Sequence, residues 1–259
     1  MSQPVTTRFA LAIALALLAV SPAFAAGTVV LRDDFNGSQL DTARWGVGTW
    51  KLGRTQLGNV PAVAGGIAQL RFDTYRLKGS EIYSKANFAR GNGMEFEARV
   101  RMNHLPSGLV TSLFTYNTLN TLSDEIDIEF LSKQINLSSG GSPMLLTTWN
   151  DWDEAHPSYN DCIHHCSQSV LVNGLDVNAF HTYTIRWLPD HTEWLVDGVL
   201  VSSSDKAQPD LATPLRLNFW APASSWTDAY DANLKPTSNR RQNKAYYYDV
   251  DWVEIRQLP

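Results

Sequence analysis

Three acidic residues, Glu125, Asp127 and Glu129, alternate with two isoleucines in a stretch that continues into further apolar residues. Alternation with a period of two predicts a β-strand whose acidic side chains share one face while the isoleucines face a core. Like charges held side by side repel, and the repulsion raises the pKa of at least one carboxyl. One carboxyl can then be protonated while another is ionised, which is the pairing that cleaves glycosidic bonds. A solvated strand face that happens to be acidic is the alternative without chemistry.

The spacing of the outer two carboxylates is compatible with that chemistry. Residues i and i+4 of a strand lie about 13 Å apart at Cα, from a rise of roughly 3.3 Å per residue. Side chains that lean inward bring their carboxyls closer, to the about 5–5.5 Å of retaining glycosidases or the about 6.5–9.5 Å of inverting ones. Sequence spacing does not choose between the two.

Aromatic and amide side chains near this strand suit the binding of sugars. The run 215–220 also alternates, and it places Asn218 and Trp220 on its polar face. An indole can stack on a pyranose while the amide bonds its hydroxyls. A Trp that merely covers a sheet edge is the alternative. Tyr116 ends the strand-like run 108–116, and it is expected beside the acidic strand because consecutive strands often pair.

Strand patterns recur along the chain, whereas helix signals are almost absent. Residues 94–102 alternate without interruption, and further strands are expected at 181–188, 193–196, 215–220 and 246–255. Asp197-Gly198 joins two apolar runs and predicts a tight hairpin. Many short strands with turn signals between them indicate an all-β sandwich or barrel.

The first 25 residues have the features of an export signal. Arg8 precedes an apolar run of residues 9–20, which is too short to span a bilayer, and residues 23–25 fit a small-x-small cleavage site. We expect residues 26–259 to form a single domain that is secreted or periplasmic and monomeric. The net charge of −5, without a basic cluster, argues against nucleic acid or an anionic membrane as a partner.

The two cysteines, Cys162 and Cys166, lie four positions apart. In an oxidising compartment such a pair most often forms a small disulfide loop. The alternative is a metal site that also uses His164, His165 or the nearby His156.

Several of these segments together resemble glycoside hydrolase family 16, and they are most similar to its bacterial lichenases, the endo-β-1,3-1,4-glucanases. The resemblance covers roughly residues 33–256 and is strongest from Gly108 onward. The segments that carry it occur in the same order: 108–116, 124–131, 180–183, 194–198, 218–220 and 251–252.

The resemblance implies a β-jelly-roll sandwich of the concanavalin A-like type, with two antiparallel sheets and a concave substrate cleft. It further implies an endo-acting, retaining hydrolase that cleaves a β-glucan polysaccharide by double displacement and requires no cofactor for catalysis. Glu125 would be the nucleophile and Glu129 the general acid/base. Asp127 would lie between them and tune both, and Tyr116, Trp149, Asn218 and Trp220 would bind the substrate.

Other details of the resemblance concern the substrate. Family members with a bulged active strand carry one extra residue before the last Glu, and the unbulged spacing here favours mixed-linkage or β-1,4-linked glucans. Ser123 stands where lichenases carry Trp, and Thr147 and Trp149 stand where they carry Asn and Tyr. A transglycosylase with the same residues and a sugar-binding sandwich without turnover remain alternatives.

A structural calcium ion is a further implication of the resemblance. Several relatives hold one on the convex face, with the Asp before the Trp of the last strand as a ligand; here that residue is Asp251. Oxygen donors of this kind suit Ca²⁺. Asp251 as an ordinary exposed strand residue is the alternative.

Overall fold

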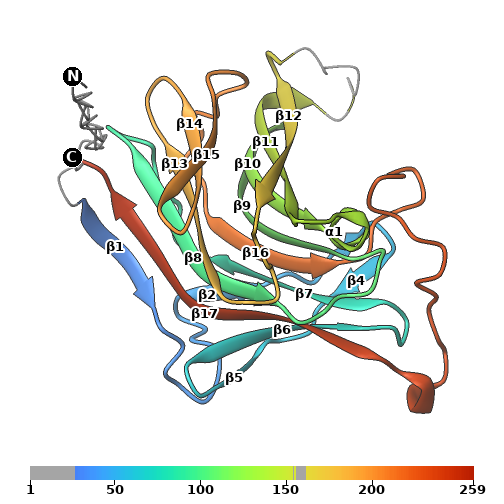
Figure 1. The fold of residues 1–259 in the computed structure, drawn as a ribbon. Helices are drawn as coiled ribbons and strands as arrows, with labels where there is room; N and C mark the ends of the chain where they lie inside the picture. Colours follow the sequence, from blue (N-terminus) through green and yellow to red (C-terminus); the bar gives the residue numbers. More distant parts are fainter. Residues whose placement is uncertain (1–26, 154, 156–161) are drawn as a thin grey trace, which may run out of the picture.

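The acidic strand lies inside a layer of seven paired strands, which faces a second curved layer and is joined to it through β7 (Lys78–Ser84) (Figure 1). The computed structural model describes residues 27–153, 155 and 162–259, so the expected export signal and His156 lie outside the described residues. The expected all-β jelly-roll sandwich is confirmed. None of the helices in the described part of the chain is long and apolar enough to cross a membrane.

The sheet that contains the acidic strand is antiparallel, with the order β2–β7–β16–β9–β10–β11–β12. Its strands are β2 (Trp45–Val47), β7 (Lys78–Ser84), β9 (Val110–Leu119), β10 (Leu122–Leu131), β11 (Gly141–Asp153), β12 (His165–Asn173) and β16 (Leu215–Trp220). The acidic trio belongs to β10, near the middle of this order.

The opposite sheet has the order β5–β6–β17–β8–β13–β14–β15, with β1 paired to residues 253–257 of β17. Its strands are β1 (Thr28–Asp33), β5 (Ala62–Ala64), β6 (Ile67–Asp73), β8 (Met94–Met102), β13 (His181–Trp187), β14 (Thr192–Val196), β15 (Val199–Ser204) and β17 (Ala245–Gln257). The short hairpin of β3 (Lys51–Leu52) and β4 (Thr55–Leu57) runs beside the start of β7. β7 therefore contacts strands of both layers.

The core between the layers determines which face of β10 carries the carboxylates. Ile126, Ile128 and Phe130 are fully or almost fully buried, and the Phe130 ring meets that of Tyr183 from the opposite sheet at 4.9 Å. Burying one such side chain contributes about 1.5–3 kcal/mol. A shift of the strand pairing by one residue would expose these three side chains to solvent and bury the carboxylates in the core. Burial of the apolar side chains therefore fixes the register.

The predicted tight hairpin is present between β14 and β15. Val196 pairs with Val199, and the two residues between them, Asp197 and Gly198, have φ angles of 49° and 76°. Two consecutive positive φ angles define the turn that matches the twist of flanking strands, and Asp-Gly tolerates them best. The alternation predicted for residues 94–102 is likewise confirmed, since every second side chain of β8 is buried.

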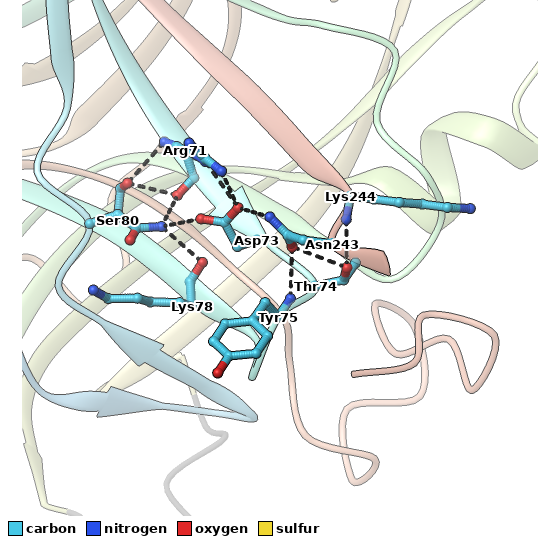
Figure 2. A network of polar contacts seen from close by, with 9 residues as sticks. Arg71, Asp73, Thr74, Tyr75, Lys78, Ser80, Asn243 and Lys244 are labelled. Carbon is cyan, nitrogen blue, oxygen red and sulfur yellow. Dashed lines mark hydrogen bonds and ion pairs between the residues drawn. The ribbon is translucent and has the colours of Figure 1, made fainter. Parts of the chain in front are cut away.

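A polar network fixes the turn from which β7 emerges (Figure 2). Asp73, at the end of β6, accepts hydrogen bonds from Arg71 and from the amide of Asn243. The Asn243 side-chain oxygen accepts the backbone N–H of Tyr75 at 2.8 Å, and Thr74 accepts that of Lys244 at 2.9 Å. The turn is thereby tied to the start of β17, next to the short 3-10 helix η1 (Arg240–Gln242).

The end of the acidic strand is held by a second set of hydrogen bonds. The one α-helix of the described chain, α1 (Ser132–Leu137), follows β10 directly. Its first residue, Ser132, donates to the Pro106 carbonyl at 2.7 Å and accepts the Leu109 N–H at 2.9 Å. Because Pro106 and Leu109 precede β9, these bonds align the two adjacent strands.

Candidate active site

The acidic trio lies in the middle of a groove on the face of the sheet that points away from the core. One half of the groove, with a volume of about 470 Å³, extends from β10 over β9, β16 and β7. The other half, of about 400 Å³, extends over β11 and β12. Glu125, Asp127 and Glu129 line both halves, so a chain that filled the groove would pass over all three.

Strand register gives each outer carboxylate different neighbours. Glu125 lies opposite Tyr116 on β9 and opposite Trp149 on β11, so both residues expected to bind substrate flank it. Glu129 lies opposite Ser112, whose hydroxyl donates a hydrogen bond of 3.4 Å to Oε1. One end of the trio is therefore flanked by two aromatic residues, and the other by Ser112 and by Leu145 of β11.

The central carboxylate, Asp127, is 5% exposed and is oriented by Trp149. The indole Nε1 donates a hydrogen bond of 3.0 Å to Asp127 Oδ2. The same indole stacks on the imidazole of His165 with ring centroids 3.7 Å apart, and His165 Nε2 lies 2.9 Å from the Ser167 hydroxyl. Trp149 thus both lines the groove and holds the carboxylate between the outer two.

The predicted disulfide between Cys162 and Cys166 is present, with Cα atoms 4.3 Å apart. It closes the loop that begins β12, and the Cys162 N–H bonds the His165 carbonyl at 3.1 Å. The loop thereby places His165 in the wall of the groove. The metal alternative finds no support, because both sulfurs are bonded to each other. In the described part of the chain, no three His, Cys, Asp or Glu side chains gather as a metal site.

Burial raises the pKa of all three carboxyls of the trio, and in each case the negative charge of another member adds to the rise. Hydrogen bonds oppose the rise: Trp149 lowers the pKa of Asp127, and Ser112 lowers that of Glu129. The groove therefore favours holding at least one proton among the three carboxyls at neutral pH.

Asn218 and Trp220, both expected to bind sugar, line the half of the groove toward β7. Asn218 Oδ1 and Trp220 Nε1 are buried and have no hydrogen-bond partner among the described residues. A buried polar atom without a partner costs free energy, which a sugar hydroxyl at this place would recover. Trp220 is only 9% exposed and packs near Trp226, so it offers a sugar little open surface for stacking.

Two charged residues of the groove were assigned no function from the sequence. Glu81 on β7 lies opposite Asn218, and its carboxylate forms a 2.9 Å ion pair with Arg216 of β16. Burial raises the pKa of Glu81 to about 7, against the lowering effects of Arg216 and Asn218. The alternation of β16 could have placed Arg216 in the groove, because it lies on the same face as Asn218. Nothing in the sequence shows that β7 pairs with β16, so Glu81 could not have been placed there.

Asp251 lies on β17, in the sheet that does not carry the groove. Its carboxylate is bound by the Arg99 guanidinium, which also lies 4.8 Å from the centroid of the Phe180 ring. A cationic side chain already neutralises this carboxylate, so the side chains at this place do not fit a calcium ion. This differs from the calcium ligand that the resemblance implied.

Calcium is therefore expected to leave the stability of the protein unchanged. The Tm in EDTA should equal the Tm in millimolar CaCl₂, because an ion that bound only the folded state would raise it. Arg99→Gln should cost up to about 1 kcal/mol, as for other partly exposed ion pairs. Thermal unfolding measures both. A Tm that falls in EDTA for the wild type, but not for Asp251→Asn, would restore the calcium assignment.

The chain belongs to the glycosyl hydrolases family 16, whose profile matches residues 54–254. Among curated proteins it is 27% identical over 218 residues to a beta-glucanase of Fibrobacter succinogenes, covering 78% of this chain and 54% of the relative. It is 28% identical over 234 residues to a beta-glucanase of Acetivibrio thermocellus, covering 85% of this chain and 62% of the relative. The chain thus spans less than two thirds of the length of these relatives.

Solved structures share the fold. A prokaryotic beta-1,3-1,4-glucanase (lichenase) from a mouse hindgut metagenome superposes with a TM-score of 0.66 at 21% identity, covering 89% of this chain and all of the other. The likeness supports the assignment of the sandwich.

Proposed function

We propose that this chain is an exported, endo-acting β-glucanase that retains anomeric configuration, with a mixed-linkage β-1,3-1,4-glucan or a related β-glucan as its substrate. The observation that carries the proposal is the position of the acidic trio in the middle of a groove that continues on both sides. A long polysaccharide can lie across such a groove and be cut internally. The names of the curated relatives and of the metagenomic lichenase support the choice of substrate.

In the proposed mechanism Glu125 attacks the anomeric carbon while Glu129 gives its proton to the glycosidic oxygen. The product with the new non-reducing end leaves, and the remaining sugar is bound to Glu125 as an ester. Glu129, now ionised, removes a proton from water, the water attacks the same carbon, and Glu125 leaves as a carboxylate. Because Glu125 is uncharged in the ester, the pKa of Glu129 falls at that stage, which allows it to act as a base.

Asp127 assists both outer residues without forming a bond to the sugar. It is hydrogen-bonded by Trp149, and its charge is one cause of the raised pKa of Glu129. A raised pKa keeps Glu129 protonated for the first step. No cofactor takes part in either step.

Export is proposed from the apolar run of residues 9–20 and from the cysteine pair, which bonds stably in oxidising compartments. The expected single domain, residues 26–259, contains the whole span matched by the family profile.

The proposal is tested by digesting lichenan, barley β-glucan, laminarin, xyloglucan, carboxymethylcellulose and agarose and sizing the products over time. We expect reducing ends to appear fastest from lichenan or barley β-glucan, with intermediate lengths first. Oligosaccharides longer than the starting pieces at early times would indicate a transglycosylase. Binding to a glucan without release of reducing ends from any substrate would refute hydrolysis and indicate a sugar-binding protein.

A further inference from the structure

Arg216 is the one Lys or Arg among the described side chains that line either half of the groove. Its guanidinium is 15% exposed and firmly anchored. Nη1 donates to Glu81 at 2.9 Å, and Nε donates to the backbone carbonyl of Tyr116 at 3.2 Å. The rings of Tyr83, Tyr116 and Trp50 surround it with centroids 5.1–5.6 Å away. Such a cation has little freedom to move toward solvent.

The anchored cation lies toward one end of the acidic trio. Tyr116, whose carbonyl holds Arg216, is directly opposite Glu125 in the pairing of β9 with β10. Asn218, the next residue on the same face of β16, lies opposite Ser112, which in turn lies opposite Glu129. Arg216 itself lies opposite Phe114, which lies opposite Asp127, so its bond to the Tyr116 carbonyl directs the guanidinium from the middle row toward Glu125. The row of Glu129 continues through Ser112 and Asn218 to the negatively charged Glu81, and these residues include no cation.

We propose that Arg216 is a positioning residue that divides the catalytic roles, by holding the negative charge on Glu125 while Glu129 keeps its proton. The inference rests on the proposed function, and it adds the reason why two glutamates of one strand behave differently. Glu81 holds the guanidinium in place. Its negative charge, in the same half of the groove, also opposes the effect of Arg216 on the ionisation of Glu125.

The charges around Glu125 agree with this division. Burial and then Glu129 raise the pKa of Glu125, a hydrogen bond with Asp127 and then the charge of Arg216 lower it, and Glu81 raises it. For Glu129, burial and Asp127 raise the pKa, Ser112 lowers it, and Arg216 makes no contribution. The titratable groups that line the two halves of the groove around Glu125 are Asp127 and Glu129 on β10, Tyr116 on β9, Glu81 on β7, Arg216 on β16 and His165 on β12.

The test uses two substitutions with opposite expected signs, each measured as kcat/KM on lichenan against pH. The acidic limb of that profile reports the ionisation of the nucleophile in the free enzyme. Arg216→Gln removes the cation, so the pKa of Glu125 rises and the acidic limb should move up by about 0.5–1 pH unit. Glu81→Gln removes an opposing charge, so the acidic limb should move down. The alkaline limb, set by Glu129, should stay in place in both.

Two further variants separate charge from structure. Arg216→Lys keeps a cation and should leave the acidic limb near its wild-type position even if activity falls. Arg241→Gln removes the same charge from an exposed site far from the groove and should change nothing. Thermal unfolding checks that each variant is folded, and the Glu81→Gln shift carries the test if Arg216→Gln does not fold.

Activity that falls equally at every pH, or acidic limbs that move in the same direction in Arg216→Gln and Glu81→Gln, would overturn the inference. Its failure is distinguishable from failure of the proposed function. Covalent labelling of Glu125 by a slow substrate would still occur if only the role of Arg216 were wrong, whereas no label would form if the chain were not a retaining glycosidase.

Discussion

Glu125→Gln is expected to lower kcat on lichenan by at least about 10⁴-fold, because the amide cannot form the glycosyl ester that divides the reaction into two steps. The loss should appear in kcat with little change in KM, since the aromatic neighbours Tyr116 and Trp149 remain. The free energy of unfolding should not fall, because Gln fills the same space and removes a charge that burial and Glu129 disfavour. Steady-state kinetics and thermal unfolding measure both quantities.

A matched substitution separates the active-site effect from the general effect of losing a carboxylate. Glu193→Gln changes a partly exposed glutamate on β14, in the sheet without the groove, and should keep wild-type activity. In Glu125→Ala, azide should restore part of the turnover, because the small anion fits the space of the missing carboxylate. Wild-type activity in Glu125→Gln would contradict the assignment of the nucleophile.

Glu129→Gln is expected to have an effect that depends on the leaving group. With lichenan, whose leaving alcohol needs a proton, kcat should fall by about 10²–10⁴-fold. With an aryl glycoside whose phenol leaves without a proton, formation of the ester should be much less affected. The result would distinguish Glu129 from Glu125, whose loss should impair both substrates.

The pH profile supplies a second criterion for Glu129. Burial and the charge of Asp127 raise its pKa, so the wild-type enzyme should lose activity as pH rises through that raised pKa. The alkaline limb of kcat/KM on lichenan should therefore be absent in Glu129→Gln. An alkaline limb that persists unchanged, or an equal loss with both kinds of leaving group, would assign the acid to a different residue.

Much of the site could be predicted from local sequence patterns. Alternation with apolar residues placed Glu125, Asp127 and Glu129 on one strand face, and burial of Ile126 and Ile128 is what enforces that face. The pairing of consecutive strands brought Tyr116 beside Glu125, as predicted. The hairpin at Asp197-Gly198 was predictable because the tight turn needs two consecutive positive φ angles, and Asp-Gly adopts them readily.

The remaining residues of the site depend on contacts between distant parts of the chain. Glu81 and Arg216 are 135 positions apart and meet only because β7 pairs with β16. Arg99 reaches Asp251 across 152 positions, so the ion pair that conflicts with a calcium ligand could not be read from the sequence around Asp251.

The role of one more carboxylate, next to the trio, could not be read from the sequence either. Asp124 adjoins the trio, yet it is 1% exposed and accepts the backbone N–H groups of Asp151, Asp210 and Leu211. Asp124 therefore ties the end of β11 and the loop before β16 to β10, and only the structure separates this role from that of the trio.

The most direct test of the account is the trapping of the glycosyl ester. A 2-deoxy-2-fluoro β-glucosyl or cellobiosyl donor with a good leaving group should react once and then hydrolyse slowly, because the fluorine destabilises both transition states. Mass spectrometry of the protein and its peptides should show one added sugar unit, attached to Glu125. A label on another residue, or turnover of lichenan by an enzyme that never becomes labelled, would contradict the double-displacement mechanism assigned to this groove.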